Sequence, residues 1–305
     1  MKKMSETIVF FGSGPVAAEA LQCLNEDFVI EAVVTKPVPP HHRGDFPVLS
    51  LAKKLGLQVY TPSNKQELSE LFLTKPVQSK LGIVIDYGII ISRDVIDYFP
   101  LGIVNSHFSL LPRWRGADPI TAAILHGDSE TGISLMLIDE KLDEGELLAQ
   151  APYEISSPLT TPQLTKDLIE LSHQTLVAVV PDYVAGHITP APQEQVSIAL
   201  LDSPTYSRKL TKEDGVIDWQ KPAQQIEREI RAYIDWPKSR TQLGGIDVII
   251  TAAKVIELTG EPGKPVIQGK KLILPCGKQA LQIIKLKPAG KQEMTAEAFL
   301  AGYNL

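Results

Sequence analysis

Residues 7–34, TIVFFGSGPVAAEALQCLNEDFVIEAVV, contain a strand, a tight turn, a helix and a second strand in succession. The runs at 7–11 and 28–34 are apolar and rich in β-forming residues, whereas residues 16–24 repeat apolar side chains at helical spacing. A strand–helix–strand unit of this kind is typical of a parallel sheet covered by helices.

The same alternation continues through the first 150 residues. Further strands are expected at 57–60, 81–86, 102–107 and 131–139, and further helices at 46–56, 65–73 and 118–127. The pattern predicts an α/β domain with a Rossmann-like, mostly parallel sheet and helices on both faces. Ligands collect at the carboxyl ends of the strands in such sheets, and Asn105 and His107 lie at one of these ends.

The second half of the chain has a different pattern of predicted secondary structure. Thr161 and Pro162 are expected to start a long helix that runs to Pro181. Residues 185–205 hold three prolines and little periodicity, which indicates an extended linker. Short strands separated by Gly and Pro turns follow, with one helix at 222–234, and they predict a small OB-like β-barrel. The predicted domains are 1–184 and 206–305, joined by the linker 185–205.

Charge is distributed unevenly along the chain. The whole sequence carries a net charge of −6. Residues 1–204 have 14 Lys and Arg against 25 Asp and Glu, a net −11, whereas residues 205–305 have 16 against 11, a net +5. A basic C-terminal module can contact the phosphates of a nucleic acid while the acidic module carries out chemistry.

Cysteine usage and hydropathy indicate a cytoplasmic protein. Cys23 and Cys276 are far apart, so they predict neither a disulfide framework nor a cysteine-based zinc site. The first apolar run is too short for a signal-peptide core, and no run reaches membrane-spanning length. We therefore expect no membrane association.

Two motifs that suggest a cofactor or a metal have simpler explanations. Gly12-x-Gly14-x-x-Ala17 resembles the dinucleotide fingerprint, but the second strand ends in Thr35 and Lys36 rather than in the acid that would bind ribose. We therefore expect a tight turn there. The doublet His41-His42 lacks a third ligand at suitable spacing, and no metal is expected.

The stretch NSHFSLLPRWRG, residues 105–116, is unusually polar for the end of a buried strand. Strand alternation places Ile103, Asn105 and His107 on one face. An amide can donate to a developing oxyanion, and an imidazole can exchange a proton near neutral pH. A third group would orient the imidazole, and residues 138–147 offer five carboxylates that the pattern alone does not separate.

The run NSHFSLLPRWRGADPI resembles the signature of the folate-dependent formyltransferase family, and Leu142-Asp143-Glu144-Gly145 is similar to its Leu-Asp-x-Gly element. The resemblance implies that Asn105, His107 and Asp143 are catalytic, with Asp143 setting the tautomer of His107. It implies 10-formyltetrahydrofolate as the co-substrate and no metal. It also implies a folate site formed by Ser109, Leu110, Leu111 and Pro112 together with Asp86, Tyr87 and Gly88.

Residues 204–219, 230–237 and 286–303 resemble the C-terminal domain of the tRNA-directed members of that family, the methionyl-tRNA formyltransferases. The implied acceptor is the α-amine of initiator methionyl-tRNA, and the alternative is an amino sugar carried on a nucleotide. Arg43, in a loop that is short and lysine-poor for this family, is expected to reach the acceptor stem. Lys270, Lys271 and Lys285 are expected to contact tRNA, and no obligate protein partner is expected.

Overall fold

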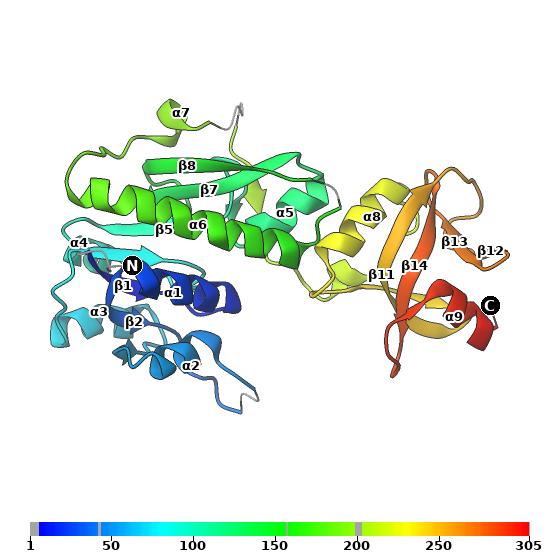
Figure 1. The fold of residues 1–305 in the computed structure, drawn as a ribbon, viewed down its shortest axis with the longest axis horizontal. Coiled ribbons are helices and arrows are strands. Elements are labelled where there is room, and N and C mark those ends of the chain that lie inside the picture. The colour runs from blue at the N-terminus through cyan, green and yellow to red at the C-terminus, as the bar shows by residue number, and fades with distance from the viewer. Residues whose placement is uncertain (1–5, 42–43, 157, 199–202, 305) are drawn as a thin grey trace. The chain divides into compact units, whose positions relative to one another are not determined.

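The computed structural model describes residues 6–41, 44–156, 158–198 and 203–304, and the chain divides into two compact units (Figure 1). Unit 1 contains Met1–Gly116, Thr131–Glu154 and Thr165–Tyr206. Unit 2 contains Ala117–Glu130, Ile155–Leu164 and Ser207–Leu305. It thus takes in α5 (Pro119–His126) from the first half of the chain, because α5 packs against α8 (Ala223–Ala232).

Among the described residues, unit 1 is built on a seven-stranded sheet. Its strands, in spatial order, are β3 (Val59–Tyr60), β2 (Val29–Val34), β1 (Thr7–Phe11), β4 (Leu81–Val84), β5 (Ile103–His107), β7 (Glu130–Leu137) and β8 (Leu147–Glu154). The strands from β3 to β5 pair in parallel, and β7 runs antiparallel to β5. The predicted α/β domain with a mostly parallel sheet is confirmed.

Helices cover both faces of this sheet. They are α1 (Pro15–Asp27), α2 (Pro47–Lys54), α3 (Lys65–Thr74), α4 (Arg93–Tyr98) and α6 (Thr161–Val184). The short α7 (Gln193–Val196) follows α6 along the chain. On one face α6 is joined to α1 by His173 and Asp27, whose Nε2 and Oδ2 atoms are 2.8 Å apart. On the other face Phe11 of β1 packs against Phe72 of α3 and against Phe99, which caps the end of α4.

Helix α6 extends beyond its predicted end. It continues through Pro181 to Val184, so the prediction of a stop at Pro181 is wrong. The proline ring removes one backbone donor, but the carbonyl of Pro181 still accepts a hydrogen bond from the Ala185 amide at 2.9 Å. In the described part of the chain, neither α6 nor any other helix combines the length and apolarity needed to cross a membrane.

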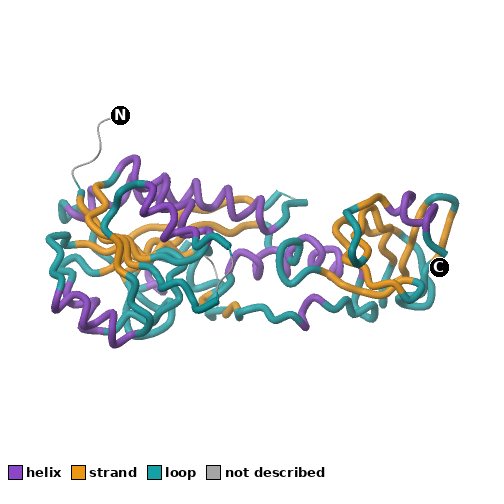
Figure 2. Tube along the Cα trace, turned by 90° about the horizontal axis from the view of Figure 1, so that it is seen from below, coloured by secondary structure: helices purple, strands orange, loops and turns teal. Residues whose placement is uncertain are grey.

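Unit 2 is built, within the described residues, on a six-stranded antiparallel sheet. Its strands are β10 (Ser239–Leu243), β11 (Ile246–Ile256), β14 (Ala280–Pro288), β13 (Lys271–Pro275) and β12 (Val266–Gln268), with β15 (Met294–Thr295) paired to β14. Figure 2 shows these strands curling around a common interior. Helices α8 and α9 (Ala296–Gly302) contribute Ile226, Ile230 and Phe299 to that core. The predicted small β-rich C-terminal domain is confirmed.

Two short elements complete the chain. The 3₁₀ helix η1 (Glu213–Gly215) precedes the segment that bridges to β10. A two-stranded ladder joins β6 (Arg115–Gly116) to β9 (Tyr206–Ser207). This ladder fixes the end of the polar stretch 105–116 to residues that follow the predicted linker.

Candidate active site

The carboxyl end of β5 presents Asn105 and His107 on the same face. The hydroxyl of Ser106, between them, forms a 2.7 Å hydrogen bond with Ser172 of α6 and so faces that helix. Asn105 and His107 therefore point to the opposite face, where Ile103 packs into the α3 and α4 core. Asn105 is half-buried, and His107 is 6% exposed. The alternation expected from the strand is present.

The imidazole of His107 is held by a backbone carbonyl. Its Nε2 lies 2.9 Å from the carbonyl oxygen of Trp114. A carbonyl can only accept a hydrogen bond, so Nε2 carries the hydrogen and the neutral ring has its lone pair on Nδ1. Nδ1 lies 3.9 Å from Oδ2 of Asp143, which is too long for a hydrogen bond. In this structure Trp114, rather than Asp143, fixes the tautomer, and the Asp143 carboxylate lies beside the ring without a hydrogen bond to it.

Asp143 is the carboxylate of the acidic run that approaches His107. Its side chain is 11% exposed, and its Oδ2 accepts a 2.7 Å hydrogen bond from the Gly116 amide. The other four acids of residues 138–147 are exposed. Asp143 has a positive φ of 52°, a conformation that a non-glycine residue adopts only when its surroundings hold it there.

Residues 143–145, which we call the Asp143 loop, are held by two side chains that the sequence did not single out for this role. Gln193 of α7 donates from Nε2 to the carbonyls of Asp143 and Gly145 at 2.9 and 3.0 Å. Arg115 donates from Nη2 to Oε1 of Gln193 at 2.8 Å, and its Nη1 is 3.3 Å from Oε1 of Glu144. The guanidinium of Arg115 is thus buried in the loop. No local sequence motif marks Gln193, because its role depends on contacts with residues that are far from it in the sequence.

The segment Ser109–Pro112 is fixed by one buried hydroxyl. Ser134 of β7 donates to the Ser109 carbonyl at 2.7 Å and accepts from the Leu111 amide at 2.9 Å and from Gln150 at 2.8 Å. Ser109, Leu110 and Leu111 are buried, and Leu111 packs on Met136 and Leu147. Pro112 is half-exposed. The exposed part of this segment is therefore Pro112 rather than its leucine side chains.

Asp86, Tyr87 and Gly88 form the turn after β4. The ring of Tyr87 is buried and meets Phe11 edge-on, with centroids 5.7 Å apart, and burial raises the pKa of its hydroxyl. Its carbonyl accepts a 2.9 Å hydrogen bond from the Ser13 hydroxyl. Asp86 is exposed, and both it and Gly88 have positive φ. The turn offers a carboxylate and backbone groups, while the tyrosine ring belongs to the core.

Close contacts surround the two glycines of the first turn. A Cβ on Gly12 would lie 2.9 Å from the Ile85 carbonyl oxygen, and one on Gly14 would lie 2.1 Å from Oδ2 of Asp86. Gly12 is required because the backbone after β4 passes close by, whereas the neighbour of Gly14 is the end of the exposed Asp86 side chain. This agrees with the expected tight turn.

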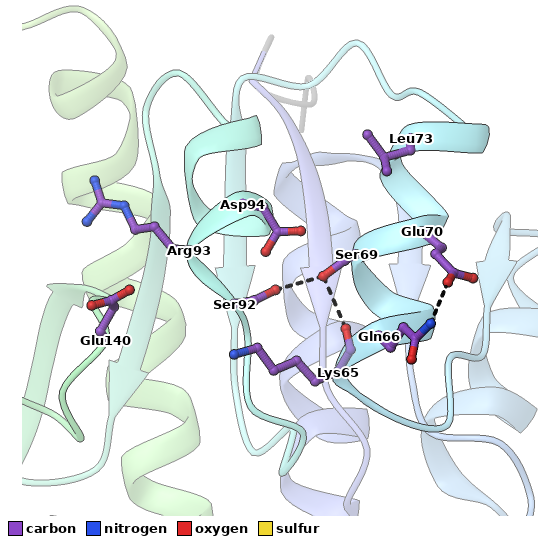
Figure 3. Close-up of a pocket in the computed structure, with 9 residues that line it drawn as sticks. All are labelled: Lys65, Gln66, Ser69, Glu70, Leu73, Ser92, Arg93, Asp94 and Glu140. Carbon is purple, nitrogen blue, oxygen red and sulfur yellow. Dashed lines mark hydrogen bonds between the residues drawn. The ribbon is translucent and has the colours of Figure 1, made fainter.

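A hollow of about 480 Å³ lies over α3 and α4 (Figure 3). Its wall mixes Lys65 and Arg93 with three carboxylates, and Ser69 and Ser92 hydrogen-bond to each other across it at 2.9 Å. The described residues that line it include none of the predicted site residues.

The predicted tRNA-binding lysines lie on the surface of unit 2. Lys270 pairs with Glu297, and Lys285 lies 3.3 Å from Glu293. Lys271 begins β13 and is exposed. Arg43, the expected contact to the acceptor stem, lies outside the described residues.

Comparison with known proteins identifies the family. Residues 7–180 match the formyl transferase family, and residues 209–304 match the formyl transferase C-terminal domain. The methionyl-tRNA formyltransferase of Roseiflexus sp. (strain RS-1) is 37% identical over 98% of this chain and 93% of its own length. That of Halorhodospira halophila is 38% identical over 99% of this chain and 98% of its own length.

A solved structure shares the fold. The N-formyltransferase from Helicobacter canadensis, in complex with folinic acid and dTDP-3-aminofucose, superimposes with a TM-score of 0.65 at 15% identity. The match covers 95% of this chain and all of that one. At this identity the likeness shows the fold alone, whereas the sequence matches extend through both units. The chain belongs to the methionyl-tRNA formyltransferase family.

Proposed function

We propose that this protein transfers a formyl group from 10-formyltetrahydrofolate to the α-amine of methionyl initiator tRNA, in the cytoplasm. The single observation that carries the proposal is the arrangement at the end of β5. There a ring with its tautomer fixed by Trp114 turns Nδ1 toward Asp143, beside the amide of Asn105. Family membership supports both the folate donor and the tRNA acceptor.

The reaction needs a nucleophile, an oxyanion donor and a route for one proton. The amine attacks the formyl carbon, the carbonyl oxygen gains negative charge, and the bond from that carbon to N10 of the folate breaks. Asn105 donates to the oxyanion, and one well-aimed donor in a dry site contributes about 3 kcal/mol. No metal takes part in these steps.

His107 carries the proton in this scheme. Its Nδ1 takes the proton of the attacking amine, and the resulting imidazolium has two N–H groups that donate hydrogen bonds. Nε2–H remains on the Trp114 carbonyl, and Nδ1–H can donate to the oxyanion before it protonates the departing N10. The carboxylate of Asp143, 3.9 Å away, stabilises the positive ring. The reference pKa of an α-amine, about 7.7–8.0, leaves a fraction of the amine neutral at pH 7, so positioning matters more than base strength.

We divide the substrate contacts between the two domains predicted from the sequence. We assign residues 1–184 to catalysis, with folate held by Ser109–Pro112 and by Asp86, Tyr87 and Gly88. Pro112 is half-exposed and the Asp86 carboxylate is exposed, and we assign to these two residues the contacts with a flat heterocycle and its polar edge. We assign residues 206–305 to tRNA, with Lys270, Lys271 and Lys285, and assign Arg43 to the acceptor end. A cavity of about 640 Å³ in unit 2 is lined in part by Arg240, Lys287 and Asp247.

One assay tests the proposal. The purified protein is incubated with 10-formyltetrahydrofolate and either methionyl initiator tRNA or a panel of nucleotide-linked amino sugars, and the formylated product is measured by mass. Transfer to the aminoacyl-tRNA alone is the expected result. Transfer to sugars and not to the tRNA would replace this function with the alternative. Asn105→Ala should lower kcat far more than it weakens folate binding.

A further inference from the structure

Gln193 lies in the segment whose sequence predicts a linker, yet its side chain is 1% exposed. It is the first residue of α7, a helix of four residues that follows Pro192. The nearby bridge between Ala191 and Leu147 attaches this segment to the first strand residue of β8. A buried glutamine at this place needs partners for both its carbonyl and its amino group.

Three hydrogen bonds of this amide are directed at the Asp143 loop and at Arg115. Both N–H groups donate to carbonyls of the Asp143 loop, at Asp143 and Gly145, and Oε1 accepts from Arg115 at 2.8 Å. Reversing the amide would set Oε1 against two carbonyl oxygens and the amino group against a guanidinium, so the network allows one orientation only.

Arg115 and Gly116 also contact the Asp143 loop directly. The Gly116 amide donates to Oδ2 of Asp143, and the Arg115 guanidinium lies 3.3 Å from Glu144. The backbone amide of Arg115 is itself held by the Thr205 carbonyl at 2.9 Å. The side chain of Gln193 therefore ties β6 to the Asp143 loop at the point where the carboxylate faces His107.

The loop has a conformation that requires such support. Asp143 has φ of 52°, and Gly145 passes so close to the Leu137 carbonyl that a Cβ there would lie 1.7 Å from its oxygen. The carboxylate of Glu144 next to Asp143 is already matched by Arg115 at 3.3 Å and by Lys141 at 3.7 Å. The two bonds donated by the neutral amide of Gln193 hold the backbone of the loop without adding charge beside Asp143.

We propose that Gln193 is a positioning residue for formyl transfer, which holds the Asp143 carboxylate at its working distance from His107. This inference rests on the proposed function of the site. The charge interaction at 3.9 Å is steep enough for the distance to matter. At an effective dielectric constant of about 20, a retreat of about 2 Å costs about tenfold in the stabilisation of the imidazolium.

The test variant is Gln193→Glu, which keeps an acceptor for Arg115 but turns an oxygen toward the two loop carbonyls. The matched control is Gln195→Glu, the same chemical change at an exposed position of the same helix. We expect Gln193→Glu to lower kcat about tenfold or more, with KM for folate and for methionyl-tRNA changed less than about twofold. Gln195→Glu should match the wild type in all three.

A second readout does not depend on substrate. The Gly116 amide is protected from hydrogen exchange by its bond to Asp143, and Gln193→Glu should accelerate that exchange while amides of β1 and β4 keep their protection. If the wild type formylates no methionyl-tRNA but this exchange accelerates, the proposed function fails and the positioning role stands. Unchanged exchange at Gly116 in the folded variant overturns the positioning role.

A double-variant cycle separates positioning from general loss of structure. Adding Gln193→Glu to the Asp143→Asn variant should lower kcat by a further factor of less than about two, because Gln193 acts through the charge of Asp143 and that charge is already absent. A full additional tenfold loss would overturn the inference. Should Gln193→Glu fail to fold, Arg115→Lys releases the same amide from its other side, and its kcat loss must likewise disappear in the Asp143→Asn background.

Discussion

Replacing Asp143 by asparagine should remove the charge that faces His107 while preserving the shape of the site. The carboxylate and Nδ1 of the ring are 3.9 Å apart, and the carboxylate is 11% exposed. At an effective dielectric constant of about 20, two unit charges at this distance interact by about 4 kcal/mol. Full loss of that interaction corresponds to about 10³-fold in rate. Since the asparagine dipole and water replace part of it, we expect kcat to fall between about 10²- and 10³-fold.

The asparagine variant leaves the local backbone contact in place. Its side-chain oxygen can still accept from the Gly116 amide, so the loop should keep its conformation. Asp139→Asn is the matched control, because it neutralises an exposed carboxylate of the same acidic run, one that accepts from the Lys141 amide. We expect Asp139→Asn to retain nearly full activity.

Single-turnover formylation with saturating folate and methionyl-tRNA measures the effect on chemistry alone. The Asp143→Asn rate should fall, whereas KM for both substrates should stay within about threefold of the wild type. A rate loss below about fivefold would refute the argument that Asp143 stabilises a positive imidazolium. A loss that appears in KM for folate would instead make Asp143 a binding residue.

Three further outcomes follow from particular contacts. Ser134→Ala removes a buried hydroxyl with three hydrogen bonds, so it should lower the free energy of unfolding by about 3 kcal/mol in a denaturant titration. It should also raise KM for folate more than it lowers kcat, whereas the exposed control Ser156→Ala should change neither. Replacing Lys270, Lys271 and Lys285 by alanine should raise KM for tRNA and reduce the salt slope of binding by about one to three, and an unchanged slope would remove them from the tRNA surface. Burial, with Glu229 and Asp214 nearby, raises the pKa of Tyr233 to about 12. The stability that the neutral tyrosine contributes is therefore complete below pH 10 and is lost as the pH rises toward 12. Tyr233→Phe should lessen alkaline unfolding between about pH 10 and 12 and change stability little at about pH 8.

The strands of unit 1 were predictable because their signal is local. Residues 7–11, 81–86 and 102–107 are short apolar runs bounded by turn residues, and the structure has strands at Thr7–Phe11, Leu81–Val84 and Ile103–His107. β8 was missed because LLAQAPYE includes a proline and lacks a clear alternation. α4 was missed because six residues are too few to establish a helical period.

The proposed catalytic residues and the residues that hydrogen-bond to their loops differ in how well the sequence predicts them. Asn105 and His107 stand out because a polar pair at the end of a buried strand is locally anomalous. Gln193 and Ser134 are ordinary residues in their own neighbourhoods. They become unusual only when folding buries them beside carbonyls that are distant in the sequence. Gln193 is 50 positions from Asp143 and 48 from Gly145, and Ser134 is 25 positions from Ser109. Such pairings leave no trace in a single sequence.

The polarity of residues 105–116 now has a physical cause beyond catalysis. An irregular segment buried at the edge of a sheet exposes carbonyls and amides that have neither a ladder nor water to satisfy them. Trp114 uses its carbonyl to hold His107, the Ser109 hydroxyl bonds to the Arg113 carbonyl, and Ser134 satisfies Ser109 and Leu111. These hydrogen bonds hold the segment in place, and Asn105 and Nδ1 of His107 are the groups that we assign to the reaction. Apolar substitution of a supporting serine should thus disturb the site even though the residue itself touches no substrate.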